Sequence, residues 1–459
     1  MKWTWIKLAL ATVLILPLVS CRTESRYNLI LISLDTLRPD HLNTYGYSRD
    51  TSPFMAQFAE DSVVFEQAFS QSPKTASSHM TIFTGLYPSV HGVENLSQKN
   101  RGLSDEIPTL ATLLSAQGYH TEAVVGGGNV SGKLGFDRGF ESYQETTELR
   151  DPIEQGARIV ERLASSAEPF FLFVHTYQVH DPYVPDPEFA DLFSDPNYAG
   201  EIIGSREELE RVAGGQEYWQ QYNAYWSRVD PKSEADAQHL RDLYDAEIRF
   251  TDDLLARFFE RVEELGLFSN TVVVVLSDHG EEFFEHGSAL HNTLYSEVLH
   301  VPLIFRLPDG LGVESGQRRK EIVRLIDIKP TILEILGIST PDHVQGTSLL
   351  DLMRGRGAAS LPVFSERIQG AKRFALQIDS WKYIRDRDRE ELYDLRTDPE
   401  ERNNLAGRNE AKLRELRRRA DDQVRANESL GRELQPGTSF ELEKQTREQL
   451  EALGYIGDS

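Results

Sequence analysis

Short apolar runs alternate with longer segments of helical spacing along most of the chain. Each run is rich in Ile, Leu, Val or Phe and leads into polar residues, which is typical of strands buried in a parallel sheet. The runs are residues 27–34, 119–125, 169–174 and 271–277. Helices are predicted around them, at residues 107–118, 153–165 and 238–265. This alternation predicts an α/β fold with a mostly parallel central sheet between helices.

Three further segments carry expectations of their own. The helix predicted at 238–265 is amphipathic and contains Asp245 and Glu247, and we expect its acidic residues to form a solvated face. Residues 186–235 are polar and aromatic, and we expect an insert of loops and helices over the functional site. Residues 449–455 are predicted to form a terminal helix.

Chemically active side chains follow two of the predicted strands. Asp35 stands at the end of the first run, and Asp278 and His279 follow the run at 271–277. In open α/β sheets, ligands bind at the carboxyl ends of the strands. An adjacent Asp and His just beyond a strand can both turn toward one ion, and imidazole fits zinc or manganese better than calcium. The alternative is a strand-end Asp that only caps a turn.

Residues 72–93 read SPKTASSHMTIFTGLYPSVHGV. The segment is small and rich in hydroxyl groups, then becomes apolar, which suits a loop that presents one side chain and enters a buried helix. Gly85 and Pro88 would end that helix, since Gly takes a positive φ and Pro cannot continue a helix. The alternative is an ordinary Ser/Thr-rich loop.

This stretch resembles the sulfatase family of the alkaline-phosphatase superfamily, whose members carry Cys-x-Pro-Ser-Arg, a few apolar residues and Thr-Gly. Counted back from Thr84 and Gly85, Thr75 stands at the nucleophile position and His79 replaces the Arg. Thr cannot give the formylglycine that sulfatases use, but its hydroxyl can attack phosphorus if a metal lowers its pKa. Segments 36–47, 295–305 and 392–405 resemble the family as well. The resemblance implies a sulfatase-like sandwich with a small C-terminal antiparallel sheet.

The chain departs from the family at several site positions. Thr36 replaces the second Asp of an Asp-Asp pair, and residues 126–129 read Gly-Gly-Gly-Asn where Gly-Lys-Trp-His is common. That glycine run either lets backbone approach a substrate or forms a flexible turn. His291 aligns with a lysine that binds the ester, and a His at this spacing resembles the phosphoethanolamine and phosphoglycerol transferases of the superfamily.

We therefore expect Asp35, Thr75, Asp278 and His279 to hold one divalent cation, with Thr75 also the nucleophile. The resemblance places His180 near the scissile group, while His175 is interpreted as a packed strand residue. His180 and His291 would steady the non-bridging oxygens or protonate the departing alcohol, which suits a side chain that titrates near pH 6.5. His79 is expected to orient the Thr75 loop. The Asp-x-x-x-His spacing of a second metal site does not occur, so one ion is expected.

The chain divides into four predicted regions. Residues 1–21 read as a secretory signal that ends in the lipobox Leu-Val-Ser-Cys, so that Cys21 is lipidated. A plain membrane anchor is the alternative, but the apolar run is shorter than a span needs. The other regions are a catalytic domain at 22–355, a small sheet subdomain at 356–405 and a charged helical tail at 406–459. These features predict a lipid-anchored protein of a bacterial cell envelope that faces the periplasm or the exterior.

Composition excludes some of the remaining possible functions. The 459 residues carry a net charge of −24, which disfavours nucleic acid as a partner. A single cysteine excludes disulfides and an active-site thiol. Three hypotheses remain: a metal-dependent hydrolase or transferase of phosphate-type esters, a sulfatase without formylglycine, and a non-catalytic binding lipoprotein. The expected substrate is a small-molecule, glycan or lipid-headgroup ester.

Overall fold

The computed structural model describes residues 27–97, 100–146, 151–214, 218–357, 360–370 and 373–441. The predicted signal, the lipobox with Cys21 and the helix predicted at 449–455 lie outside these described residues. Within them, none of the helices combines the length and the apolar character needed to cross a membrane.

The molecule is built on an eight-stranded sheet with the order β11-β2-β10-β7-β1-β6-β4-β5. β10 is antiparallel to both of its neighbours, and the other pairings are parallel. The strands are β1 (Asn28–Leu34), β2 (Val63–Phe69), β4 (His120–Val125), β5 (Ser142–Glu145), β6 (Phe170–Thr176), β7 (Thr271–Leu276), β10 (His300–Arg306) and β11 (Gln317–Arg324). The predicted α/β architecture with a mostly parallel central sheet is confirmed.

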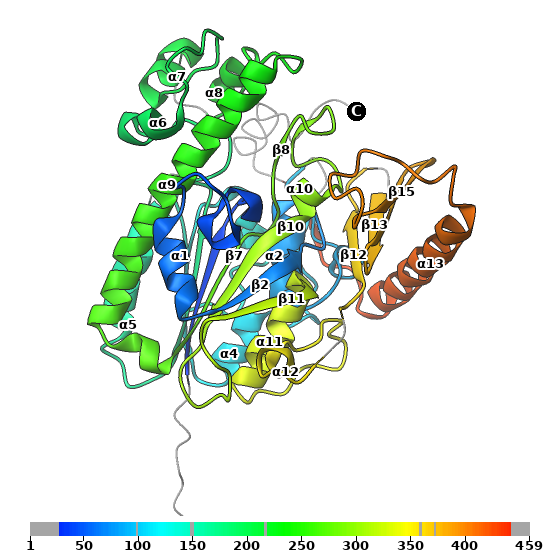
Figure 1. Cartoon of the computed structure of the whole chain (residues 1–459). Coiled ribbons are helices and arrows are strands. Elements are labelled where there is room, and N and C mark those ends of the chain that lie inside the picture. Colours follow the sequence, from blue (N-terminus) through cyan, green and yellow to red (C-terminus); the bar gives the residue numbers. More distant parts are fainter. Residues whose placement is uncertain are drawn as a thin grey trace, which may run out of the picture.

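Helices cover both faces of this sheet (Figure 1). Because side chains alternate along a strand, Leu29 and Leu31 of β1 join one apolar core, and Ile30 and Ile32 join the other. The first core contains α2 (Thr75–Thr84), α4 (Leu110–Ala116) and α11 (Ile328–Ile335). The second core contains α1 (Pro53–Glu60), α5 (Asp151–Leu163) and α9 (Glu234–Glu264).

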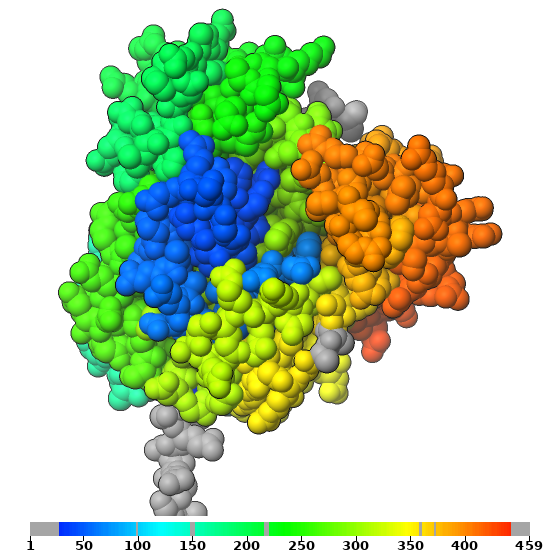
Figure 2. All heavy atoms as spheres, viewed as in Figure 1, coloured from blue at the N-terminus to red at the C-terminus, as the bar shows by residue number. Residues whose placement is uncertain are grey.

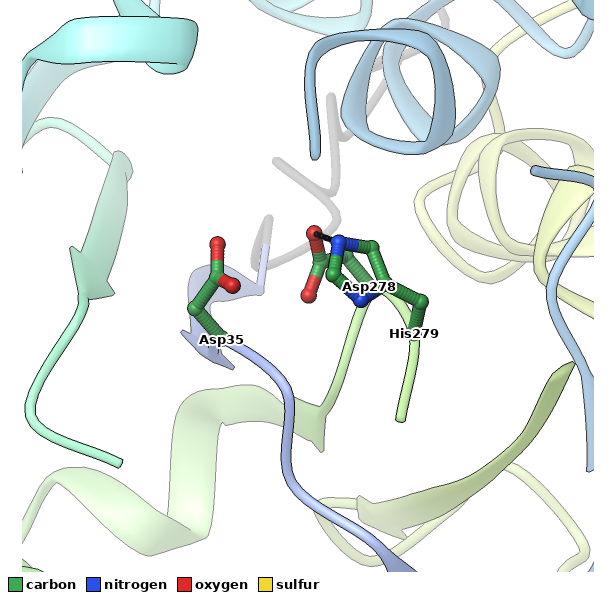
Figure 3. Close-up of side chains that lie close together, drawn as sticks. All are labelled: Asp35, Asp278 and His279. Atoms are coloured by element: carbon green, nitrogen blue, oxygen red, sulfur yellow. Dashed lines mark ion pairs between the residues drawn. The ribbon is translucent and has the colours of Figure 1, made fainter. Parts of the chain in front are cut away.

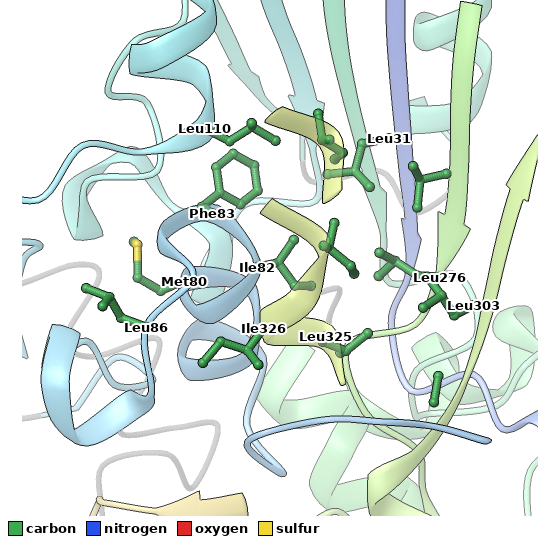
Figure 4. Close-up of a cluster of buried hydrophobic side chains, with 14 of the residues drawn as sticks. Leu31, Met80, Ile82, Phe83, Leu86, Leu110, Leu276, Leu303, Leu325 and Ile326 are labelled. Carbon is green, nitrogen blue, oxygen red and sulfur yellow. The ribbon is translucent and has the colours of Figure 1, made fainter. Parts of the chain in front are cut away.

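The helix predicted after the hydroxyl-rich loop is α2, and every one of its residues is buried. Figure 4 shows Phe83 and Ile82 of α2 packed among apolar side chains of the sheet and of neighbouring segments. Gly85 ends the helix with a φ of 70°, as the sequence predicts. A helix fixed along its whole length gives the residue at its start, Thr75, a defined position.

The prediction of a solvated acidic face on α9 holds for the exposed glutamates near its C-terminal end, at positions 260, 263 and 264, but is wrong for Asp245 and Glu247. Asp245 and Glu247 are buried. Asp245 accepts hydrogen bonds from His41, Tyr47 and Arg49, which all lie in the segment that follows β1. Glu247 accepts from the amide of Gln178 and from the backbone of Val184. These carboxylates therefore hold α9 to the segments that follow β1 and β6, next to the functional site.

Two further units flank the central sheet. The insert expected at 186–235 contains α6 (Pro187–Phe193), α7 (Arg206–Ala213) and α8 (Tyr218–Trp226). The C-terminal antiparallel sheet consists of β12 (Val363–Arg367), β13 (Arg373–Ile378), β14 (Trp381–Asp386) and β15 (Arg389–Asp394), followed by α13 (Glu410–Glu433). Glu366 of β12 bonds to the backbone of Gln71 and Ser89 and so attaches this sheet to the loop before α2. In Figure 2 the surface is hollowed between the blue N-terminal segment and the orange C-terminal sheet.

The remaining elements are short. They are α3 (Pro88–His91), α10 (Ser296–Leu299), α12 (Leu350–Met353), β3 (Asn100–Arg101), β8 (Glu282–Phe283), β9 (Ala289–Leu290) and β16 (Ser439–Phe440).

Candidate functional site

The ends of β1 and β7 bring three predicted ligands together. The two strands are parallel neighbours, so the residues that follow them meet at one edge of the sheet. Asp35, Asp278 and His279 each offer a ligand atom, and these atoms lie within 4.8 Å of one another. All three residues are 0% exposed. In Figure 3 the three side chains converge at this edge, and one oxygen of Asp278 pairs with the His279 ring.

The donor set fits a cation. Asp35 Oδ1 and Asp278 Oδ2 are buried without a hydrogen-bond partner. Burial raises the pKa of Asp35, but the bond from His175 and nearby imidazoles hold that pKa down to about 2. Burial and the negative charge of Asp35 raise the pKa of Asp278 well above its ordinary value. Two buried carboxyl groups with unmet oxygens are the arrangement that a divalent cation would satisfy.

His279 presents its Nε2 to the same point. Its Nδ1 lies 3.0 Å from the carbonyl oxygen of Gly280 and donates to it, so Nε2 carries the free lone pair. That Nε2 lies 3.3 Å from Asp278 Oδ2 and 3.3 Å from Thr75 Oγ1. Burial lowers the pKa of His279 to about 4, and a neutral imidazole is the form that binds metals.

His175 has a part in the site that the sequence analysis missed. It is a buried residue of β6, as predicted, but its Nε2 also donates to Asp35 Oδ2 at 3.1 Å. The bond occupies one carboxylate oxygen and leaves Oδ1 free. Partners of this kind commonly orient metal ligands. Its position one strand away from Asp35 could have indicated the contact, since β1 and β6 are hydrogen-bonded neighbours.

Thr75 is the first residue of α2, and His79 holds its backbone in place. His79 Nδ1 donates to the Thr75 carbonyl at 2.9 Å, and its Nε2 accepts from Ser33 of β1 at 2.9 Å. Burial lowers the pKa of His79 to about 3, so the ring stays neutral. The positive end of the α2 dipole also lies at Thr75, where it favours negative charge.

His180 and His291 lie beside this cluster. The ring centre of His291 is 4.4 Å from that of His279 and 5.4 Å from that of His180. His180 Nδ1 donates to the Asp181 carbonyl at 3.0 Å, which leaves Nε2 free to accept. The side chain of Asp181 in turn accepts from Trp226 of the insert. All six residues predicted from the sequence therefore lie in one neighbourhood.

His291 differs from the expectation of titration near pH 6.5. Burial and the charges of neighbouring cationic groups lower its pKa well below the ordinary value. Its Nδ1 lies 3.4 Å from a carboxylate oxygen of Glu281. In the free protein the ring is therefore neutral, and only added negative charge in the site, such as a bound anion, favours its protonation.

The glycine run of residues 126–129 makes room for an aromatic ring. A Cβ on Gly126 would lie 2.5 Å from the ring of Tyr177. The Tyr177 hydroxyl accepts from the backbone N–H of Asn129, and the ring packs against His175 and His180. This close packing against Tyr177 is a role that neither of the two interpretations, an approach to substrate or a flexible turn, had given to the run. Tyr177 was not singled out by sequence reasoning.

A cavity of about 790 Å³ lies near the start of α2. Its lining includes Glu94, Asn95, Ile368 and Phe440. Asn95 Oδ1 accepts from the N–H of Ala76, so one residue of the cavity lining contacts the first turn of α2. Cavities of this volume accommodate a sugar or a headgroup.

Comparison with known proteins agrees with the fold. An arylsulfatase of Clostridium perfringens is 24% identical over 459 residues, which is 84% of this chain and 92% of that protein. A solved complex with D-glucosamine-2-N,6-O-disulfate, described as its substrate, superposes with a TM-score of 0.73 at 21% identity over 88% of this chain and 98% of the other. A phosphonate monoester hydrolase of Agrobacterium radiobacter superposes with a TM-score of 0.66 at 19% identity over 90% and 96% of the two chains.

Family models give the assignment. The C-terminal model of N-sulphoglucosamine sulphohydrolase matches residues 284–428, and the sulfatase model matches residues 27–338. The chain therefore belongs to the sulfatase family of the alkaline-phosphatase-like superfamily, whose members are metal-dependent hydrolases.

Proposed function

We propose that this member of the sulfatase family uses Thr75 as its nucleophile and acts on phosphate or phosphonate esters rather than on sulfate esters. The observation that carries the proposal is the place of Thr75: it begins α2, and its Oγ1 lies 3.3 Å from His279 Nε2. A threonine at this position cannot form the aldehyde hydrate that sulfatases use. Its hydroxyl can form and release a phosphoryl ester.

Asp35, Thr75, Asp278 and His279 would hold one divalent cation. The donor set contains an imidazole, which favours zinc or manganese over calcium. A cation there supplies positive charge that lowers the pKa of an adjacent hydroxyl and offsets the charge of a bound phosphate. The set resembles the one-metal centre of the phosphoethanolamine transferases.

The side chains divide the reaction between them. Thr75 loses its proton to water and its oxygen attacks phosphorus, so that the Thr75 Oγ1–P bond forms while the bond from phosphorus to the ester oxygen breaks. His180 or His291 donates a proton to the departing alcohol. A water or alcohol acceptor then attacks phosphorus, gives its proton to the same imidazole and releases Thr75. The anionic substrate raises the proton affinity of His291, which is otherwise neutral.

The relatives support two substrate classes. The phosphonate monoester hydrolase among the structural neighbours favours phosphorus esters. The arylsulfatase of Clostridium perfringens favours a second candidate, hydrolysis of sulfate esters without formylglycine. The complex with a sulfated glucosamine favours a glycan ester as substrate over a simple aryl ester.

An assay of paired aryl esters separates the two candidates. The purified metal-loaded chain is assayed with 4-nitrophenyl phosphate, 4-nitrophenyl phenylphosphonate and 4-nitrophenyl sulfate. We expect turnover of the phosphorus esters and a loss of at least about a thousandfold in kcat for Thr75→Ala. Thr81→Ala, another buried threonine of α2, serves as the control and keeps the activity. Turnover of the sulfate alone, or full activity of Thr75→Ala, contradicts the proposal.

We also propose that lipidation of Cys21 anchors the protein to a bacterial envelope, where it faces the periplasm or the exterior. The support is the lipobox pattern before Cys21. Expressed from its full sequence, the protein should fractionate with membranes, and Cys21→Ser should lose its lipid by intact mass. A wild-type chain without lipid contradicts this proposal.

A further inference from the structure

Three cationic side chains gather on one neutral residue at the edge of the site. Lys74 Nζ donates to the side-chain oxygen of Asn292 at 2.8 Å. Arg367 and Arg373 reach the backbone oxygen of Asn292 at 3.3 and 3.4 Å. We call Lys74, Arg367 and Arg373 the cationic cluster. Lys74 directly precedes Thr75, and Asn292, which all three contact, directly follows His291, so the cluster lies next to two predicted catalytic residues.

The cluster is short of negative charge. Arg373 pairs with Asp386 at 2.7 Å, but the structure, over its described residues, gives Lys74 and Arg367 no ion pair. Glu281 attracts Lys74 only from a distance, and Asp386 and Glu94 attract Arg367 in the same way. Arg367 Nε is buried without a hydrogen-bond partner, and Lys74 is 8% exposed.

A purely structural role explains this arrangement poorly. The arginines come from β12 and β13, so their bonds to Asn292 do tie the C-terminal sheet to the site. Neutral donors would make the same bonds without the free energy that it costs to bury Lys74, and partly bury Arg367, with no ion-pair partner. A guanidinium with an unused Nε–H and an ammonium with free protons are instead suited to bind an oxyanion.

We propose that Lys74, Arg367 and Arg373 form a subsite for a second anionic group of the substrate, a carboxylate, sulfate or phosphate separate from the scissile ester. The inference rests on the proposed function, because it assumes that the ester binds at Thr75. The scissile group has its own partners in the metal centre, His180 and His291. Lys74 binds Asn292 whereas Thr75 faces His279. These two adjacent residues would therefore contact different groups of the substrate.

Calorimetry with matched ligands tests the subsite without turnover. The metal-loaded full chain is titrated with ω-phosphonocarboxylates of three to eight carbons and with the alkylphosphonates of equal length, which lack only the carboxylate. We expect at least one phosphonocarboxylate to bind about tenfold more tightly than the alkylphosphonate of equal length. Arg367→Gln should remove that advantage and leave the affinity for alkylphosphonates within about twofold.

The control is Arg389→Gln, which changes an exposed arginine of the same sheet and should keep the advantage. Arg367→Gln should not lower the melting temperature, because it removes a partly buried charge that lacks an ion-pair partner, and Gln can still donate to the Asn292 oxygen. Two results overturn the subsite: the wild type prefers none of the phosphonocarboxylates over the matched alkylphosphonate, or Arg367→Gln loses affinity equally for both ligand series. The second result would assign Arg367 to the scissile group.

The two proposals fail differently. If phosphorus esters are not turned over and phosphonates do not bind, the proposed function is wrong. The comparison is then repeated with ω-sulfocarboxylates and alkylsulfonates, and the same tenfold criterion decides the subsite. If phosphorus esters are turned over but no phosphonocarboxylate binds more tightly than its matched alkylphosphonate, the proposed function stands and the subsite is wrong.

Discussion

His175 fixes one oxygen of Asp35 and leaves the other free for a ligand. Replacing it with Phe keeps a ring in the β6 core but removes the donor to Asp35. We expect His175→Phe to bind zinc or manganese about 10- to 100-fold more weakly, because outer partners orient the ligands they touch. Metal titration by calorimetry measures the change. His120→Phe, at a partly exposed histidine, is the control, and equal affinity in both variants would rule out the orienting role.

At the residue scale, the sequence indicates the metal ligands and misses their neighbours. Asp35 and Asp278 are predictable because strand ends of a parallel sheet share an edge. Arg367 is not, because it reaches the site from a separate sheet near the C-terminus. His175 was assigned to packing alone because a buried strand residue gives no sign of what its polar atoms contact.

At the element scale, a buried histidine at the contact between α3 and α2 makes the stability of the fold depend on pH. His91 is 2% exposed, its Nδ1 accepts from Val93 N–H at 3.1 Å, and its Nε2 lies 3.2 Å from Thr81. Burial lowers its pKa from 6.5 to about 3. Between these values the unfolded chain binds more protons, so the stability that neutral His91 contributes is complete above pH 6.5 and is lost as the pH falls toward 3.

We therefore expect the free energy of unfolding to fall more steeply with acid in the wild type than in His91→Gln. The difference in slope should approach about 1.4 kcal/mol per pH unit below pH 5.5. Urea unfolding from pH 7 to pH 4 measures both slopes. Equal slopes in the two proteins would show that His91 is not held neutral by the fold. The size of a constant difference in stability between them gives no information on the protonation of His91.

The elements also show where pattern alone fails. The strands β1, β4, β6 and β7 are predictable because continuous apolar runs fit a sheet that is covered on both faces. β11 is not, because it lies at the sheet edge and its first five residues are all polar. The acidic residues of α9 were misassigned because Asp245 pairs with Arg49, nearly two hundred positions earlier.

At the scale of the whole molecule, the candidate site lies where three units meet. The central sheet supplies the candidate metal ligands, the insert reaches Asp181 through Trp226, and the C-terminal sheet brings its arginines to Asn292. The resemblance to the sulfatase family gives the central sheet and the small C-terminal sheet in advance. It gives no information on the arginines, which depend on this chain's own side chains.

The central claim is that Thr75 becomes covalently modified during turnover. Peptide mass spectrometry of acid-quenched enzyme, taken during the reaction with 4-nitrophenyl phosphate, tests it most directly. The account predicts a phosphoryl group on Thr75, at a mass accuracy that separates it from sulfuryl. Turnover that continues while the Thr75 peptide stays unmodified, or a phosphoryl group on another residue, would contradict it.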